Sequence, residues 1–118
     1  MTNAEDLDGG LWIIAAIVRN GVCLARAYMD GNELTDIDRK RLWALISRTA
    51  QVGPPFNDEK FKKVEGPIFE FKSYQDRLLC FFDGERRIVI THGCKKKTNR
   101  ARKEEITRAL TLRAEYFA

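Results

Sequence analysis

Eight lysine and arginine side chains, and no aspartate or glutamate, lie between Arg86 and Lys103 in the segment RRIVITHGCKKKTNRARK. This segment, called the cationic run below, contains an apolar stretch at Ile88–Ile90 that is typical of a strand, and a helix-like pattern follows it. Like charges on folded elements repel one another unless a polyanion or an acidic partner neutralises them. The cationic run therefore predicts a binding site for such a partner, against the simpler interpretation of a solvated surface.

Three consecutive lysines, Lys95, Lys96 and Lys97, are the part of this run best suited to chemistry. Crowded ammonium groups disfavour one another's charged form, which lowers their pKa values toward neutrality. A lysine needs such a lowered pKa if it is to exchange protons near pH 7. If the preceding strand continues past Gly93, Lys95 and Lys97 lie on one side of it and Lys96 on the other. Fixed cations of this kind can also stabilise the charge that develops on a phosphate during its transfer or cleavage.

Two further side chains have chemistry that suits RNA. His92 is the single histidine, and its ordinary pKa makes it a candidate general base. Its place beside Gly93 at the end of a strand is equally typical of a buried, hydrogen-bonded histidine. Tyr74 lies between two predicted strands, where it could stack on an unpaired base or cover the edge of the core.

The charge is unevenly distributed along the chain. Residues 1–59 carry six basic and nine acidic side chains, whereas residues 60–118 carry fifteen basic and eight acidic ones. The 118 residues are enough for one domain with its own core, and an apolar fraction of 44% is that of a globular protein. We therefore expect the function to reside in the second, basic half.

Composition also argues against several classes of site. The three cysteines, Cys23, Cys80 and Cys94, have no metal-ligand spacing, so we expect buried thiols in a reducing compartment and neither a metal nor another cofactor. The apolar run Leu11–Val18 is too short to span a membrane, and the acidic residues before it are unlike a signal peptide. We expect a cytoplasmic protein without a membrane partner.

The apolar pattern predicts an α+β fold. Residues 1–10 are interpreted as a flexible lead-in to a single domain over residues 11–118. The elements expected in that domain are a central strand at 12–19, a short helix at 22–29, a helix from Thr35 to Gly53, strands at 67–74, 77–82 and 86–92, and a helix at 102–117. Thr35 and Asp38 have the spacing of a capping box, and Asp83-Gly84 predicts a hairpin turn. The later strands should form an antiparallel meander, with the helices packed on one face of a twisted sheet.

The order of these elements and several local motifs resemble the RelE/ParE-type toxins of type II toxin–antitoxin systems, and among them the HigB-like, phage-derived branch. The motifs are Phe69-Glu70-Phe71-Lys72, Arg77 at the start of the next strand, and His92-Gly93-Cys94-Lys95-Lys96-Lys97-Thr98 followed by a helix with Glu105-Ile106 and Ala109. The resemblance extends over nearly the whole chain, from Trp12 to Tyr116, and is most specific over residues 68–109. Three positions depart from the family pattern: Lys72 replaces an arginine, Cys94 a phenylalanine and Ala101 a proline.

The resemblance implies an endoribonuclease that cleaves mRNA on the translating ribosome, without a metal, by attack of a ribose 2′-hydroxyl on the adjacent phosphate. It also implies a cognate helix-turn-helix antitoxin as partner, and a toxin–antitoxin complex that could bind operator DNA. The catalytic residues expected from the motifs and the strand geometry are Arg77, Lys95, Lys97, Lys96 and His92. The residues expected to bind RNA or its phosphates are Lys72, Arg86, Arg87, Arg100, Arg102 and Tyr74.

Other functional classes share this pattern of elements. A ParE-like gyrase poison would act by binding alone, but it would not need a tight lysine cluster. An inactive phage-derived relative that only binds protein partners is a second alternative, and the replacement of arginine by Lys72 favours it, because lysine lacks the planar fork of arginine. A DNA-binding regulator fits less well, since the sequence contains no helix-turn-helix pattern.

Overall fold

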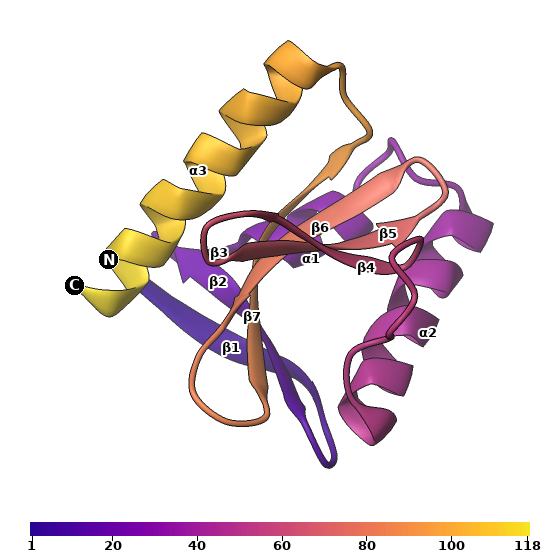
Figure 1. The fold of residues 1–118 in the computed structure, drawn as a ribbon, viewed down its shortest axis with the longest axis horizontal. Coiled ribbons are helices and arrows are strands. Elements are labelled where there is room, and N and C mark those ends of the chain that lie inside the picture. Colours follow the sequence, from indigo (N-terminus) through magenta and orange to yellow (C-terminus); the bar gives the residue numbers. More distant parts are fainter.

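The computed structural model describes residues 1–118, and its elements are arranged around one central sheet (Figure 1). Their order is β1 (Thr2–Gly9), β2 (Ile13–Arg19), β3 (Val22–Cys23), α1 (Leu24–Met29), α2 (Asp36–Val52), β4 (Phe61–Glu65), β5 (Ile68–Ser73), β6 (Asp76–Phe82), β7 (Arg87–Lys95) and α3 (Asn99–Phe117). None of the helices is long and apolar enough to cross a membrane.

The seven strands form one sheet in the order β1-β2-β7-β6-β5-β4, with β3 paired to the end of β2. All neighbouring strands are antiparallel except β2 and β7, which run parallel with Ile14 opposite Ile88. The predicted α+β class, the antiparallel meander of β5 to β7 and the central position of β2 are confirmed. The parallel pair arises because the chain crosses from β2 through both helices and the meander before β7 returns beside it.

Helices cover both faces of the sheet, so the prediction that they pack on one face is wrong (Figure 1). Side chains from Asp76 to Phe81 in β6 are all buried, which requires cover on both sides. On one face Phe71, Leu78 and Ile88 pack with α1 and α2. On the other face the sheet packs against α3, with Leu79, Phe81 and Val89 in contact with Ile106, Ala109 and Leu112.

The predicted flexible lead-in over residues 1–10 is also wrong, since Thr2–Gly9 forms strand β1. It pairs with β2 from Thr2 opposite Arg19 to Gly9 opposite Ile13. The acidic side chains suggested a solvated tail, but charged residues are common on edge strands, where they discourage pairing with other chains. Here Glu5 forms an ion pair with Arg26 at 3.0 Å, and Asp6 lies 3.3 Å from Arg87.

The local signals in the sequence are reproduced at the ends of α2. The Thr35 hydroxyl accepts a hydrogen bond from the Asp38 backbone amide, and the Asp38 carboxylate accepts one from the Thr35 amide, so the capping box is confirmed. Gly53 ends the helix with a φ of 89°, a conformation that favours glycine. Helix α3 begins at Asn99, three residues before the predicted start at 102, and this brings Arg100 into its first turn.

The correction at β1 can be tested by hydrogen exchange. We expect the β1 amides that bond to β2 to exchange at least about 100-fold more slowly than an unstructured peptide of the same sequence, because exchange requires β1 to detach. The exposed connection at residues 56–59 provides the internal control, since only local opening limits its exchange. Exchange of residues 2–8 as fast as that of the connection, measured by mass spectrometry, would contradict the strand.

Candidate functional site

One end of the sheet collects most of the predicted site residues. Lys72 in β5 lies opposite Arg77 in β6, and Arg77 lies opposite Cys94 in β7. Strand β7 ends at Lys95, and the lysine run continues from there toward the start of α3. A shallow cavity at this end is lined by Glu70, Arg77, Leu79, Cys94, Lys95, Lys96, Lys97, Arg102, Glu105 and Ile106. Five cations and two carboxylates therefore surround it, and we call it the cationic site.

Glu70 is the buried anion that holds two arginines of the cationic site in place. It is 3% exposed, and its Oε1 accepts a hydrogen bond from Arg102 Nη2 at 2.9 Å. Arg77 is 7% exposed, and its Nε lies 3.8 Å from the same oxygen. Arg77 Nη1 donates to the carbonyl oxygens of Tyr74 and Asp76, at 2.7 and 3.0 Å. The guanidinium of Arg77 is thus largely enclosed by its own turn.

A second buried carboxylate positions Lys95. Asp76 is 1% exposed, and its Oδ1 accepts hydrogen bonds from Tyr28 Oη at 2.5 Å and from Lys95 Nζ at 2.8 Å. Burial and the Asp76 carboxylate together raise the pKa of Tyr28, which keeps the phenol protonated as the donor. The hydrogen bond to Asp76 therefore holds the Lys95 ammonium on the face of the sheet that carries α1 and α2, away from Lys96 and Lys97.

Lys96 and Lys97 are the exposed members of the lysine run. Strand β7 continues past Gly93, as the prediction required, but it ends at Lys95, so the alternation of a strand does not extend to Lys97 and a shared side for Lys95 and Lys97 stays a prediction. The Lys96 backbone amide donates to the Gln75 carbonyl oxygen, which fixes the chain at the turn between β5 and β6. Neither lysine has an ion-pair partner in this structure, so both ammonium groups face solvent at the mouth of the cavity.

His92 lies beneath the cationic site and not on its surface. It is 1% exposed, and burial, with the nearby Arg108 charge, lowers its pKa to about 4. Its Nδ1 lies 3.0 Å from Thr91 Oγ1, and its Nε2 lies 3.5 Å from Glu105 Oε1. This is the buried, hydrogen-bonded histidine that its sequence position also suggested, and the imidazole is out of reach of a substrate at the surface.

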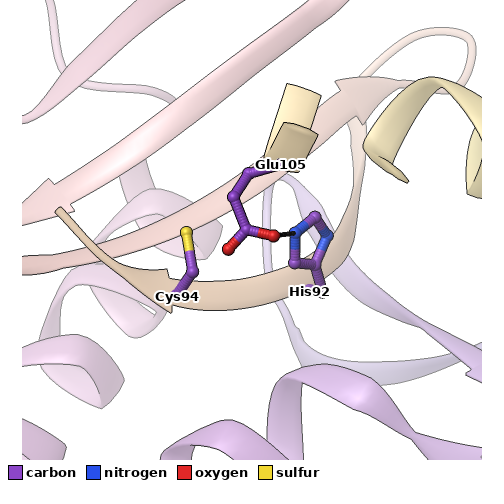
Figure 2. Close-up of side chains that lie close together, drawn as sticks. All are labelled: His92, Cys94 and Glu105. Carbon is purple, nitrogen blue, oxygen red and sulfur yellow. Dashed lines mark ion pairs between the residues drawn. The ribbon is translucent and has the colours of Figure 1, made fainter. Parts of the chain in front are cut away.

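Three potential metal ligands lie close together beneath the cavity, whose wall includes two of them, Cys94 and Glu105, and the sequence did not predict this grouping (Figure 2). His92 and Cys94 point to the same face because they are two residues apart on β7. Glu105 reaches them from α3, and the ligand atoms of all three residues lie within 4.8 Å of one another. The His-Gly-Cys alternation on a strand was the available signal, but it gives no information on which helical residue would lie opposite.

A second basic groove lies on the other side of the turn between β5 and β6. It has a volume of about 500 Å³, and it is lined by Arg41, Ala44, Leu45, Arg48, Glu59, Lys60, Lys72, Ser73 and Tyr74. Tyr74 is 70% exposed, so it does not cover the core, and the Arg41 guanidinium lies 4.0 Å from the centre of its ring. Arg41 and Arg48 were not predicted, because the basic residues of α2 have the pattern of a solvated helix face, and Lys60 was not predicted because it lies in the polar connection before β4.

The structure separates the remaining predicted RNA-binding residues. Arg87 lies at the start of β7 with Asp6 and Asp83 as ion-pair partners, and Arg86 is exposed in the preceding turn. Arg87 and Lys95 are the two ends of the nine-residue strand β7, which separates them by about 25 Å. Arg100 is exposed on the first turn of α3, close in sequence to Arg102. The predicted residues therefore divide into a group at or near the cationic site, Lys72 and Tyr74 in the groove beside it, and a distant pair, Arg86 and Arg87.

A comparison with known protein families matches most of the chain. The family model described as phage derived protein Gp49-like (DUF891) matches residues 30–114. This range begins directly after α1 and includes α2, the strands β4 to β7 and most of α3, so it contains the cationic site and the groove beside Tyr74. No match is found among curated proteins.

The role of Asp76 in holding Tyr28 and Lys95 predicts a large effect on stability. Asp76→Ala leaves a buried hydroxyl and an ammonium without their shared acceptor, and we expect it to lower the free energy of unfolding by about 2–4 kcal/mol. The matched control is Asp36→Ala, which removes an exposed partner of Arg39 and should cost less than about 0.5 kcal/mol. Equal effects of the two substitutions in urea unfolding would rule out this role for Asp76.

Proposed function

Because this chain belongs to the phage-derived Gp49-like family, a RelE/HigB-like toxin family, we propose that it is an mRNA-cleaving toxin of a type II toxin–antitoxin system. The proposed reaction is endonucleolytic cleavage of mRNA in the translating ribosome. The observation that carries this proposal is the convergence of Lys72, Arg77, the lysine run and Arg102 at one end of a rigid sheet. A non-catalytic adaptor would not require cations from β6, from the lysine run at the end of β7 and from α3 to meet around one cavity.

The cleavage needs no metal ion at the phosphate. The 2′-oxygen attacks the adjacent phosphorus, its proton passes to a base, and the 5′-oxygen leaves with a proton from an acid. The phosphorane formed on the way carries extra negative charge, and preorganised cations stabilise that charge more than they stabilise the substrate. Lys96 and Lys97 are assigned to the scissile phosphate and to proton transfer, because both are exposed at the mouth of the cavity.

The other residues of the cationic site, and Lys72 in the groove beside Tyr74, have supporting roles in this proposal. Arg77 and Arg102 supply positive charge behind the lysines, and Lys72 binds a neighbouring phosphate. Lys95 is directed away by Asp76, so it is assigned to positioning and not to the reaction. His92 is enclosed, which makes it a poor candidate for the general base.

The family is associated with toxin–antitoxin systems, which implies an antitoxin partner. We propose that this partner is a helix-turn-helix protein of HigB-type systems, that the pair binds operator DNA, and that the toxin acts in the cytoplasm on ribosomes. An antitoxin that covers Lys96 and Lys97 with acidic side chains would block the proposed site directly.

A second candidate function is that of a binding toxin without catalysis. The observation that favours it is the enclosure of Arg77, whose Nη1 already donates to two backbone carbonyls and whose side chain is buried beside Glu70. Such a protein would still arrest growth, but it would leave mRNA intact.

The proposal predicts that cleavage depends on the two exposed lysines. After brief induction, primer extension on a reporter mRNA should show translation-dependent cuts for the wild type and at least about 100-fold fewer cuts for Lys96→Ala/Lys97→Ala, since general acid–base catalysis contributes that much or more. The matched control is Lys62→Ala/Lys63→Ala, which removes the same charge from exposed positions of β4 and should cleave normally.

Each outcome of this experiment has one interpretation. Growth arrest with intact mRNA in the wild type would replace the endoribonuclease by the binding toxin. Equal loss of cleavage in both double variants would show that net charge, and not the cationic site, determines activity. Unchanged thermal melting of the variants establishes that they fold.

Tyr74 should contribute to RNA binding through its ring and not through its hydroxyl. We expect Tyr74→Ala to weaken binding of a single-stranded RNA by about 5- to 150-fold, because stacking of one base is worth about 1–3 kcal/mol. Tyr74→Phe keeps the ring, and it should bind like the wild type at the same salt concentration. If the two variants weaken binding equally in fluorescence anisotropy titrations, the ring does not stack on a base.

A further inference from the structure

The cluster of His92, Cys94 and Glu105 offers three potential metal-ligand atoms, one fewer than a tetrahedral metal site needs (Figure 2). His92 is 1% exposed and Cys94 is 8% exposed, and the side chain of Glu105 is 20% exposed. All three side chains point toward a common point between β7 and α3. His92 Nε2 has no hydrogen-bond partner, although it is buried. Buried polar atoms rarely lack a partner, so this atom needs an explanation.

One tautomer of His92 satisfies both contacts of the Thr91 hydroxyl at once. The Thr91 hydroxyl donates its single hydrogen to the Leu79 carbonyl oxygen at 3.2 Å. The contact of 3.0 Å between Thr91 Oγ1 and His92 Nδ1 must then be donated by the imidazole. In this tautomer the neutral ring carries its hydrogen on Nδ1, and Nε2 presents the lone pair that a metal ion needs; in the other tautomer Thr91 gives up its bond to Leu79, and the Nε2 hydrogen faces Glu105 at 3.5 Å.

That lone pair faces another acceptor. Nε2 lies 3.5 Å from Glu105 Oε1, so a nitrogen lone pair and a carboxylate oxygen oppose each other in a buried place. Two acceptors at this distance repel each other unless a positive charge lies between them. The Cys94 sulfur lies beside the same point, and it adds a third donor atom with the preferences of a borderline-soft metal.

We propose that His92 Nε2, the Cys94 thiolate and the Glu105 carboxylate bind one Zn²⁺ ion, with a water molecule as the fourth ligand. Imidazole nitrogen, thiolate sulfur and carboxylate oxygen are the three ligand types that Zn²⁺ takes in proteins. Binding displaces one proton, from the Cys94 thiol to solvent, and breaks no other bond. The Thr91 hydroxyl acts as the outer partner that orients the imidazole, as such partners do in zinc sites.

The size of the cluster suits this ion. Zinc–ligand bonds of about 2.0–2.3 Å in a tetrahedron place ligand atoms about 3.3–3.7 Å apart. The distance of 3.5 Å between Nε2 and Oε1 already has this value, and the largest ligand separation, within 4.8 Å, requires a contraction of about 1 Å. Rotation of the Glu105 side chain, the most exposed of the three, provides that movement.

Charge balance explains how a dication can bind beneath so many cations. Arg108 and Lys97 are close enough to act on His92 and Cys94, and they would repel an isolated positive charge. One thiolate and one carboxylate cancel the two charges of Zn²⁺, so the completed site is neutral; relative to the metal-free cluster, binding adds one positive charge and not two, because the Cys94 proton leaves. A bound ion would join the first turns of α3 to the end of β7, on either side of the lysine run.

The test uses Co²⁺ as a spectroscopic substitute for Zn²⁺ on the purified, reduced full chain. We expect one Co²⁺ per chain with a near-ultraviolet charge-transfer band, which requires a thiolate ligand, and displacement of this band by Zn²⁺. Cys23→Ser is the matched control, because Cys23 lies outside the cluster on β3, and this variant should keep the band. Cys94→Ser should lose it. Glu105→Gln should weaken Zn²⁺ binding by at least about tenfold, the smallest loss seen even for outer partners of zinc ligands.

The proposal does not depend on RNA cleavage, so an inactive toxin with a normal cobalt band would still support it. Absence of the band at saturating Co²⁺ would overturn the site, and so would a band that Cys94→Ser retains or that Cys23→Ser removes. If Cys94→Ser does not fold, the measurement passes to Glu105→Gln, whose partly exposed position tolerates the change. Equal stabilisation of wild type and Glu105→Gln by Zn²⁺ in thermal melts would then overturn the proposal.

Discussion

The burial of β6 on both faces is the constraint on which the rest of this structure depends. A strand that is apolar on both sides needs cover from two layers, and the chain supplies α1 and α2 on one side and α3 on the other. Because α3 must cross the face opposite α1 and α2, its first turns come to lie beside the end of β7. Arg102 and Glu105 reach the sheet for this reason. The cationic site and the cluster of His92, Cys94 and Glu105 therefore both follow from the packing of α3 against the sheet.

Close packing at this end leaves little freedom for the residues that position the cations. Tyr28 from α1 lies against Gly93 in β7, where a larger residue would overlap its ring, and this contact lets its hydroxyl reach Asp76. Asp76 in turn holds Lys95. The buried carboxylates Glu70 and Asp76 stand on opposite faces of the sheet, so each face has one anion that fixes the neighbouring cations. Removing the cationic partners of either Glu70 or Asp76 would leave a buried carboxylate without a partner, which is strongly destabilising.

Local signals in the sequence were sufficient for elements that depend on neighbouring residues. The capping box of Thr35 and Asp38 and the turn at Asp83-Gly84 involve contacts only a few residues apart, and the structure contains both. Strand β1 was missed because it becomes a strand only through pairing with β2, while its acidic composition suggests a solvated tail. Glu105 was missed for a related reason, since its approach to His92 depends on how α3 packs, and no spacing in the sequence encodes that packing.

The same long-range packing determines which cations are available to a polyanion. Arg77 and Arg102 already share the Glu70 carboxylate, so an RNA phosphate must compete with a buried anion for their hydrogen bonds. Moving Arg102 to a phosphate would leave Glu70 with Arg77 alone, at 3.8 Å, and this cost reduces the net gain from the new contact. Lys96 and Lys97 have no such internal partner, and each can bind a phosphate without first losing an ion pair. The sequence ranked these cations by motif and strand side. In the structure these cations differ in the internal ion pair that each would lose on binding a phosphate. Lys96 and Lys97 lose none, so they are better placed to bind RNA than Arg77 and Arg102.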